Sequence, residues 1–155
     1  MTSPPPSELR PSVDSDLTWL LHRAAQHLRG VTSEQAERIG LQMREYIILG
    51  ALGTVADLTQ AELGKAIGLD KTTLTSQLDR LERNGLIERH HHPRDRRIRI
   101  PVITAAGAAL CAEVSKACAA VETEVLAGFE PEQVQTFRHM LVAIIGEGDD
   151  PGSCL

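Results

Sequence analysis

The basic residues of this chain gather in one segment. Of 16 Lys and Arg residues, nine lie between positions 65 and 100, together with five Asp and Glu, although the 155-residue chain has 21 acids and a net charge of −5. The run His90, His91 and His92 adds partial positive charge there as the pH falls. A basic segment on an acidic body predicts a local face for an anion such as the backbone of a nucleic acid.

Other kinds of chemistry find little support in the sequence. No nucleophile–base set, phosphate loop or carboxylate pair is evident, so we expect neither an enzyme nor a cofactor. Successive histidines of a strand point to opposite faces, so at most two can share a site, and no nearby Cys or Glu completes a tetrahedral set. We therefore expect no metal site. Three cysteines are too few for a disulfide framework. Four aromatic residues disfavour a protein that stacks single-stranded bases.

Two short helices must position the basic residues. Thr59 can cap a helix over 60–67, and Glu62 stands at the spacing of a capping box. Asp70 can cap a second helix over 71–84, which a glycine follows. Two short helices joined by a tight turn form a helix-turn-helix pattern.

A β-hairpin follows the second helix directly. Residues 86–90 are typical of a short strand, and residues 93–96 of a polar turn. Residues 97–103 are typical of a second strand, and its first four residues alternate between Arg and Ile with the period of a half-exposed strand. Pro101 confines that strand to a sheet edge. The hairpin therefore has the form of a wing beside the helix-turn-helix.

A helix of this kind fits the major groove of B-DNA, and a basic wing can reach a neighbouring minor groove. Hydroxyl groups can reach base edges or phosphates, an amide can read adenine, and Arg80 can either contact phosphate or pair with Asp79 or Glu82. A solvated helix face is the alternative, but the caps, the glycine stop and the hairpin together favour DNA. The candidate residues of the helix are Lys71, Thr72, Thr73, Thr75, Ser76, Gln77 and Arg80.

The candidate residues of the wing are Arg94, Asp95, Arg96 and Arg97. A carboxylate two residues from an arginine can hold the guanidinium in one rotamer. We therefore expect Asp95 to orient the Arg97 side chain for the minor groove. An ordinary charged turn is the alternative.

The flanking segments predict further helices. A first helix begins near Asp14–Asp16 and ends at Gly30, with a short helical turn following through Ile39, and a densely apolar helix covers 42–52. Thr104 begins a long helix that reaches about Gly128. Its two apolar stripes predict burial on two sides.

A last helix begins at Pro131. Val134, Phe137, Leu141 and Ile144 follow the spacing of a helix-packing seam. The fold class is therefore mainly α with a small β-wing. We divide the chain into a flexible arm (1–13), a helical dimerisation region (14–40 and 104–147), a winged helix-turn-helix DNA-binding lobe (41–103) and a tail (148–155).

These residues resemble a known family. The stretch from Leu58 to Leu63, the run Leu69-Asp70-Lys71-Thr72-Thr73-Leu74-Thr75, and the run from Leu78 to Ile87 are similar to the winged-helix core of the MarR family of bacterial transcriptional regulators. Pro93-Arg94-Asp95-Arg96-Arg97 and Ile103-Thr104-Ala105-Ala106-Gly107 match the wing and the start of the next helix of that family.

The resemblance implies a homodimer with interlocking terminal helices, bound to a pseudo-palindromic operator in double-stranded DNA, usually as a repressor. It places Thr72, Thr73 and Ser76 on the base-reading face, and Arg97, oriented by Asp95, on the wing. Many members have Arg where Ser76 stands. It also implies that a small, often aromatic, ligand or an oxidant releases the DNA.

An effector site is expected between the dimer helices and the lobe. Trp19, His22 and Arg23 share one face of the first helix and could hold an aromatic carboxylate or phenolate, with Met43 and Tyr46 as wall residues. A solvated or inter-subunit face is the alternative.

Two other functions stay open. One is a winged-helix module that binds an acidic protein. The other is redox regulation through Cys111 and Cys118, although their place among Ala and Val favours packing. No apolar run approaches the roughly 20 residues of a membrane span. The expected location is cytoplasmic, at the bacterial nucleoid.

Overall fold

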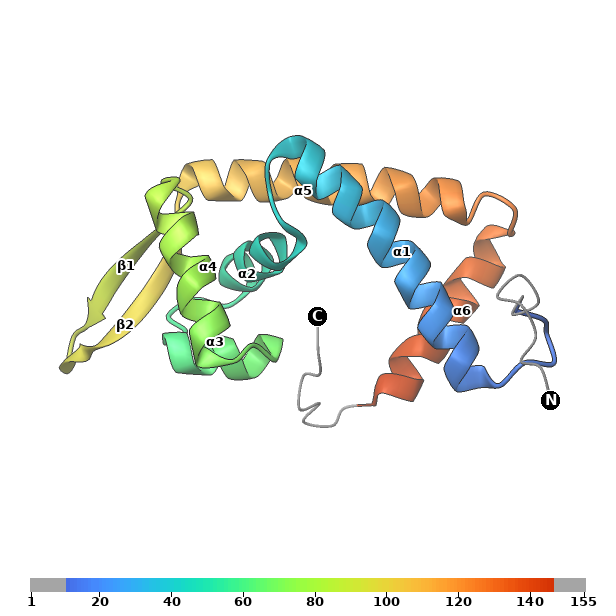
Figure 1. The fold of residues 1–155 in the computed structure, drawn as a ribbon, viewed down its shortest axis with the longest axis horizontal. Coiled ribbons are helices and arrows are strands. Elements are labelled where there is room, and N and C mark those ends of the chain that lie inside the picture. Colours follow the sequence, from blue (N-terminus) through green and yellow to red (C-terminus); the bar gives the residue numbers. More distant parts are fainter. Residues whose placement is uncertain (1–10, 147–155) are drawn as a thin grey trace, which may run out of the picture.

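A computed structural model describes residues 11–146. The helices are α1 (Leu17–Ile39), α2 (Met43–Thr54), α3 (Gln60–Ile67), α4 (Lys71–Arg83), α5 (Ala105–Val125) and α6 (Pro131–Ile145), and the strands are β1 (Ile87–His92) and β2 (Asp95–Ile103). Figure 1 shows α2, α3, α4 and the hairpin as a lobe at one end, with α6 and the start of α1 at the other and α5 reaching across both. The predicted fold class, mainly helical with a small wing, is confirmed. The predicted tail and most of the predicted arm lie outside the described residues.

The core of the lobe comes from apolar stripes on its helices. Ile48 and Leu49 of α2, Leu63 of α3 and the hairpin residue Ile87 are almost completely buried. The predicted inward stripe of α4, which consists of Leu74, Leu78 and Leu81, is also buried and confirms the helix periodicity. Val114 and Cys118 of α5 join the same core, so α5 is packed into the lobe.

The first helix does not end where its glycine suggested. Helix α1 runs without a break through Gly30 to Ile39, so the predicted stop is wrong. The Thr32 hydroxyl, which could have capped a new helix, donates instead to the Leu28 carbonyl at 2.8 Å within the same helix. A glycine inside a helix costs only about 0.5–1 kcal/mol, which tertiary packing overcomes. The helix ends at Gly40, whose φ of 102° is left-handed.

Helix α5 approaches the lobe very closely at its N-terminus. The Thr104 hydroxyl donates to the Gly85 carbonyl at 2.7 Å and accepts from the Gly107 N–H at 3.1 Å. A β-carbon on Gly107 would lie 2.1 Å from the Leu86 carbonyl oxygen, which is far inside van der Waals contact. A glycine is therefore required where α5 crosses the chain that leads into the wing. The helix ends at Val125, slightly before the predicted Gly128.

The wing is a two-stranded antiparallel sheet. Ile87 pairs with Ile103 at its base, and His92 pairs with Asp95 beside the tip, after a register shift between His91 and His92. Both strands extend further toward the tip than predicted, because Asp95 and Arg96 belong to β2 and not to the turn. The hairpin itself is confirmed.

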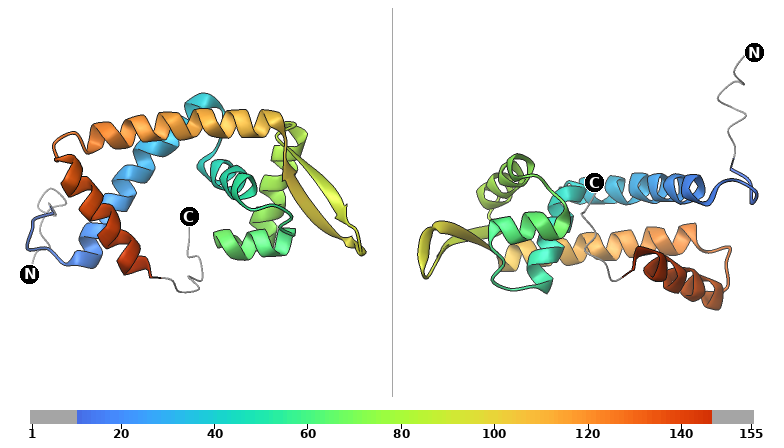
Figure 2. Two further views of the ribbon diagram at one scale, coloured as in Figure 1. Left: turned by 180° about the vertical axis from the view of Figure 1, so that it is seen from behind. Right: turned by 90° about the horizontal axis from the view of Figure 1, so that it is seen from below.

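Helix α6 is poorly covered within one chain. None of its residues is buried, and Phe137 of the predicted seam is 42% exposed while Ile144 is 58% exposed. Arg138 forms an ion pair with Glu122 of α5 at 2.9 Å. Helix α6 and the lobe lie at opposite ends of the molecule in both views of Figure 2. Within the described residues, Phe137 and Ile144 are thus open to another surface, whereas Val134 and Leu141 are half-buried.

Candidate nucleic-acid interface

The N-terminus of α4 is fixed by its own cap. Gly68, with a φ of 65°, makes the turn between α3 and α4. The Asp70 carboxylate accepts hydrogen bonds from the N–H and the hydroxyl of Thr73, at 2.9 and 2.6 Å. These hydrogen bonds lower the pKa of Asp70. The capping box of α3, between Thr59 and Glu62, forms as predicted.

Two of the threonines predicted to contact DNA use their hydroxyl protons inside the helix. Thr73 donates to Asp70, and Thr75 donates to the Lys71 carbonyl at 2.7 Å. They can offer DNA only a methyl group or the remaining lone pairs of the oxygen. Thr72 and Ser76, in contrast, are exposed on the helix surface.

Gln77 is only half exposed, and its Oε1 atom is buried without a hydrogen bond. The amide is therefore turned partly into the lobe, as its position near the inward side of the helix suggested. Its predicted contact with adenine would require the side chain to rotate outward.

Arg80 has a partner that the sequence analysis missed. Its Nε lies 2.9 Å from Oε1 of Glu45, a residue of α2 that is 1% exposed. The alternative prediction that Arg80 pairs with Asp79 or Glu82 is therefore wrong. The sequence did contain a signal for this pair, because Glu45 is a carboxylate within the dense apolar stretch of the helix that follows Gln42.

The acids Asp79 and Glu82 hold Arg89 of β1 instead. The Arg89 guanidinium lies 2.7 Å from Asp79 Oδ1, and its Nε donates to Glu82 Oε2 at 2.9 Å. The pair lowers the pKa of Glu82 and raises that of Arg89. These contacts join the base of the wing to the outer face of α4, so the two parts are positioned together.

At the tip of the wing, Asp95 has a different role from the predicted one. Its carboxylate accepts from the main-chain N–H of Arg97 at 2.9 Å, and no ion pair joins it to the Arg97 guanidinium in the described part of the chain. The reason is local, because an Asp side chain readily binds the amide two residues further on. Arg94, Arg96 and Arg97 are all exposed, as a DNA-contacting wing requires.

The histidines shape the same hairpin. Nδ1 of His91 lies 2.7 Å from the Arg96 carbonyl oxygen, and Nδ1 of His92 accepts from the Arg94 N–H at 3.2 Å. Among the described residues no cluster of His, Cys, Asp and Glu could hold a metal ion. His91 and His92 contact the main chain of the turn, whereas His90 lies 3.3 Å from the Glu88 carboxylate.

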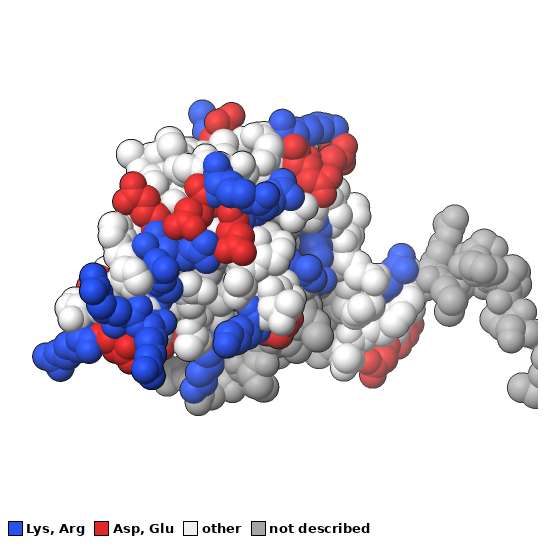
Figure 3. Space-filling view, turned by 60° about the vertical axis from the view of Figure 1, so that its left-hand side comes forward, with Lys and Arg blue, Asp and Glu red and all other residues white. Residues whose placement is uncertain are grey.

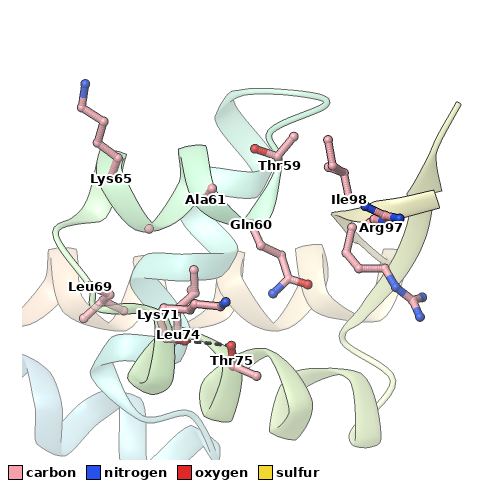
Figure 4. Close-up of a pocket in the computed structure, with 12 residues that line it drawn as sticks. Thr59, Gln60, Ala61, Lys65, Leu69, Lys71, Leu74, Thr75, Arg97 and Ile98 are labelled. Atoms are coloured by element: carbon pink, nitrogen blue, oxygen red, sulfur yellow. Dashed lines mark hydrogen bonds between the residues drawn. The ribbon is translucent and has the colours of Figure 1, made fainter. Parts of the chain in front are cut away.

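A groove of about 650 Å³ joins the two predicted DNA-binding parts. It lies between α3, the first turns of α4 and strand β2, and Figure 4 shows Gln60, Thr75 and Arg97 around it. The basic residues Lys65, Lys71, Arg97 and Arg99 line it. The start of α4 and the wing therefore open on the same side of the molecule, where Lys and Arg side chains gather (Figure 3).

The predicted effector residues form no single site within one chain. The Arg23 guanidinium stacks on the Trp19 ring, 5.9 Å from its centroid, while His22 is exposed. Met43 and Tyr46 pack against the lobe core. Figure 1 shows why the groups stay apart, since the N-terminal end of α1 and helix α2 lie at different ends of the molecule.

Both cysteines of α5 pack against neighbouring residues of the core. The Cys118 thiol contacts the Thr32 carbonyl oxygen at 3.8 Å, and Cys111 is half-buried beside the core. Burial raises the pKa of both thiols, which disfavours the thiolate that reacts with oxidants. The environment is that of packing residues.

The helix-turn-helix, the basic hairpin behind it and the long helices around them define a winged helix-turn-helix protein. Residues 39–98 match the MarR family model. YwoH of Bacillus subtilis (strain 168), an uncharacterized HTH-type transcriptional regulator, is 27% identical over 128 residues, which cover 83% of this chain and 93% of that protein. The winged helix-turn-helix part of this chain is therefore similar to that of the MarR family of transcriptional regulators.

Solved structures have the same architecture. Mutant MarR from E. coli complexed with operator DNA superimposes with a TM-score of 0.70 and 26% identity, covering 82% of this chain and 96% of that chain. CouR from Rhodococcus jostii RHA1 bound to p-coumaroyl-CoA gives a TM-score of 0.73 at 22% identity, covering 89% and 97%. In the described residues no helix is both long and apolar enough to cross a membrane.

Proposed function

We propose that this protein binds a pseudo-palindromic operator in duplex DNA as a homodimer and acts as a repressor. The observation that carries the proposal is the shared opening of α4 and the wing, because Lys71 and Thr75 border the same groove as Arg97. In this arrangement α4 enters the major groove while the wing follows the backbone toward the minor groove. The relative complexed with operator DNA supports binding to an operator.

Duplex binding should weaken steeply with salt, because each phosphate contact releases counterions. We expect Arg97→Ala to lower the affinity about 10-fold at 100 mM salt and to make the salt dependence shallower by about one contact. Fluorescence anisotropy of a labelled duplex, measured between 50 and 200 mM salt, tests both effects. Arg38→Ala is the control, since it removes the same charge from an exposed site on α1.

A protein-interaction module is the competing function, and the same assay separates the two. If roughly 100-fold excess of protein at low salt binds no duplex from a random pool, the DNA-binding proposal fails. The basic face would then be assigned to an acidic protein partner.

Sequence preference should reside in the two exposed residues of α4. Thr72→Ala and Ser76→Ala should change the preferred bases, each with an effect of about 1 kcal/mol on discrimination, because they remove contacts to base edges. Lys71→Ala should weaken all duplexes alike, since a phosphate contact reads no sequence. Selection from random duplexes with each variant checks this. Identical preferred sequences for the wild type and both α4 variants would contradict it.

The dimer is proposed from the α6 seam, of which one chain leaves Phe137 and Ile144 exposed. A small aromatic effector is proposed from Trp19 and Arg23, which offer a ring face and a cation on the α1 end that lies beyond the lobe. CouR bound to p-coumaroyl-CoA is a relative in fold that holds an aromatic ligand. The same anisotropy assay, repeated with phenolic carboxylates, tests for release of the duplex.

A further inference from the structure

Glu45 is a charged residue in the core of the lobe. It is 1% exposed, on a helix whose other inward residues are Ile48, Leu49 and Leu52. Taking a carboxylate out of water is costly unless the charge is paired and hydrogen-bonded. The position therefore needs specific partners, and the structure supplies two.

The two oxygens of Glu45 face different elements. Oε2 accepts a hydrogen bond of 2.8 Å from the main-chain N–H of Gln42, which begins α2. Oε1 lies 2.9 Å from Nε of Arg80 on α4. One oxygen is thus fixed by the start of its own helix, where an acidic group is favoured by the helix dipole. The other forms an ion pair with Arg80 of α4, although Oε1 accepts no hydrogen bond.

Arg80 is only partly used by this pair. Its contact to Glu45 is made through Nε, and 42% of its side chain is exposed. The terminal N–H groups of the guanidinium remain geometrically suited to a phosphate. A long side chain that is already held in one conformation loses less entropy on binding.

We propose that Glu45 is a positioning residue for DNA binding. It holds the Arg80 guanidinium so that the terminal N–H groups meet a backbone phosphate beside the major groove occupied by α4. The inference rests on the proposed function, and it assigns a role to a buried carboxylate that never touches DNA.

The sign of one mutational effect separates this role from simple electrostatics. Glu45→Gln removes a negative charge near a polyanion, so charge alone would strengthen binding. Loss of positioning would weaken it. Glu88→Gln is the matched control, because it removes the same charge from an exposed residue of the lobe.

The experiment uses the full chain and a duplex selected by the wild type from a random pool. We expect Glu45→Gln to lower the affinity about 3- to 10-fold at 100 mM salt, whereas Glu88→Gln leaves it unchanged or higher. Arg80→Met should lower it about 10-fold and make the salt dependence shallower by about one contact. Adding Glu45→Gln to Arg80→Met should cause no further loss.

Thermal unfolding of each variant identifies those that are folded at the assay temperature. Arg80→Lys provides the test if Glu45→Gln unfolds, because it keeps the charge but loses Nε. If Glu45 positions Arg80, this variant should lose affinity for the duplex. If only the charge matters, its affinity should be unchanged.

Equal or tighter binding by folded Glu45→Gln overturns the inference while the proposed function stands. An unchanged salt dependence in Arg80→Met overturns it as well. A wild-type protein that binds no duplex overturns both.

Discussion

Replacing Phe137 with Asp is expected to leave the protein monomeric and to reduce its affinity for an operator duplex by about 100-fold or more. Phe137 lies at the middle of the α6 seam, between Val134 and Leu141, and the residue is 42% exposed in one chain. If a second copy covers this seam, the substitution buries an unpaired charge in the interface.

The loss of DNA binding follows from the loss of the second lobe. In a dimer, binding of one lobe to a half-site presents the other lobe at a high effective concentration, which a monomer cannot do. Analytical ultracentrifugation gives the oligomeric state, and fluorescence anisotropy gives the affinity. Thr136→Asp introduces the same charge at an exposed polar position of α6 and should leave the dimer intact. A Phe137→Asp protein that is still dimeric would remove α6 from the proposed interface.

Gly107→Ala is expected to destabilise the protein by about 2–3 kcal/mol, which is at the upper end for a single added methyl group. The new β-carbon would lie 2.1 Å from the Leu86 carbonyl oxygen and 3.0 Å from the Ile103 side chain. The carbonyl is main chain and accepts from the Thr104 N–H, so it cannot rotate away as a flexible side chain would. Helix α5 must then move away from the base of the wing.

Urea unfolding followed by far-UV circular dichroism, at one protein concentration, measures this effect. Gly50→Ala is the matched control, because Gly50 lies within α2 and a β-carbon there would meet nothing within 4 Å. It should stabilise the protein by about 0.5–1 kcal/mol through helix propensity. Equal midpoints for Gly107→Ala and the wild type would show that α5 can shift without cost.

Features that depend on neighbouring residues were predictable. The caps at Thr59 and Asp70 involve residues three positions away, and both formed as the sequence indicated. The inward stripe of α4 was equally clear, because a period of 3.6 residues fixes which side chains face the core. The end of α1 was not predictable, since Gly30 is only a weak local signal and packing further along keeps the helix intact, with Ala36 fully buried.

The partners of the charged residues could not be predicted in the same way. Glu45 and Arg80 are far apart in sequence and meet only because α2 and α4 share a core. Asp95 was correctly placed beside Arg97, but spacing cannot decide whether its carboxylate binds the guanidinium or the main-chain amide. Residue types therefore located the interface, whereas the tertiary fold decided which of its cations are already engaged.

The wing has a consequence for the protein away from DNA. A sheet of only two strands has no interior strand, so each strand has one side without a strand partner. Exposed strand edges of this kind invite pairing between molecules, and charged side chains along them prevent it. Arg94 is exposed in the turn at the tip, and Arg96, Arg97 and Arg99 are exposed on β2. Charged side chains at these positions disfavour edge-to-edge pairing between the hairpins of free molecules.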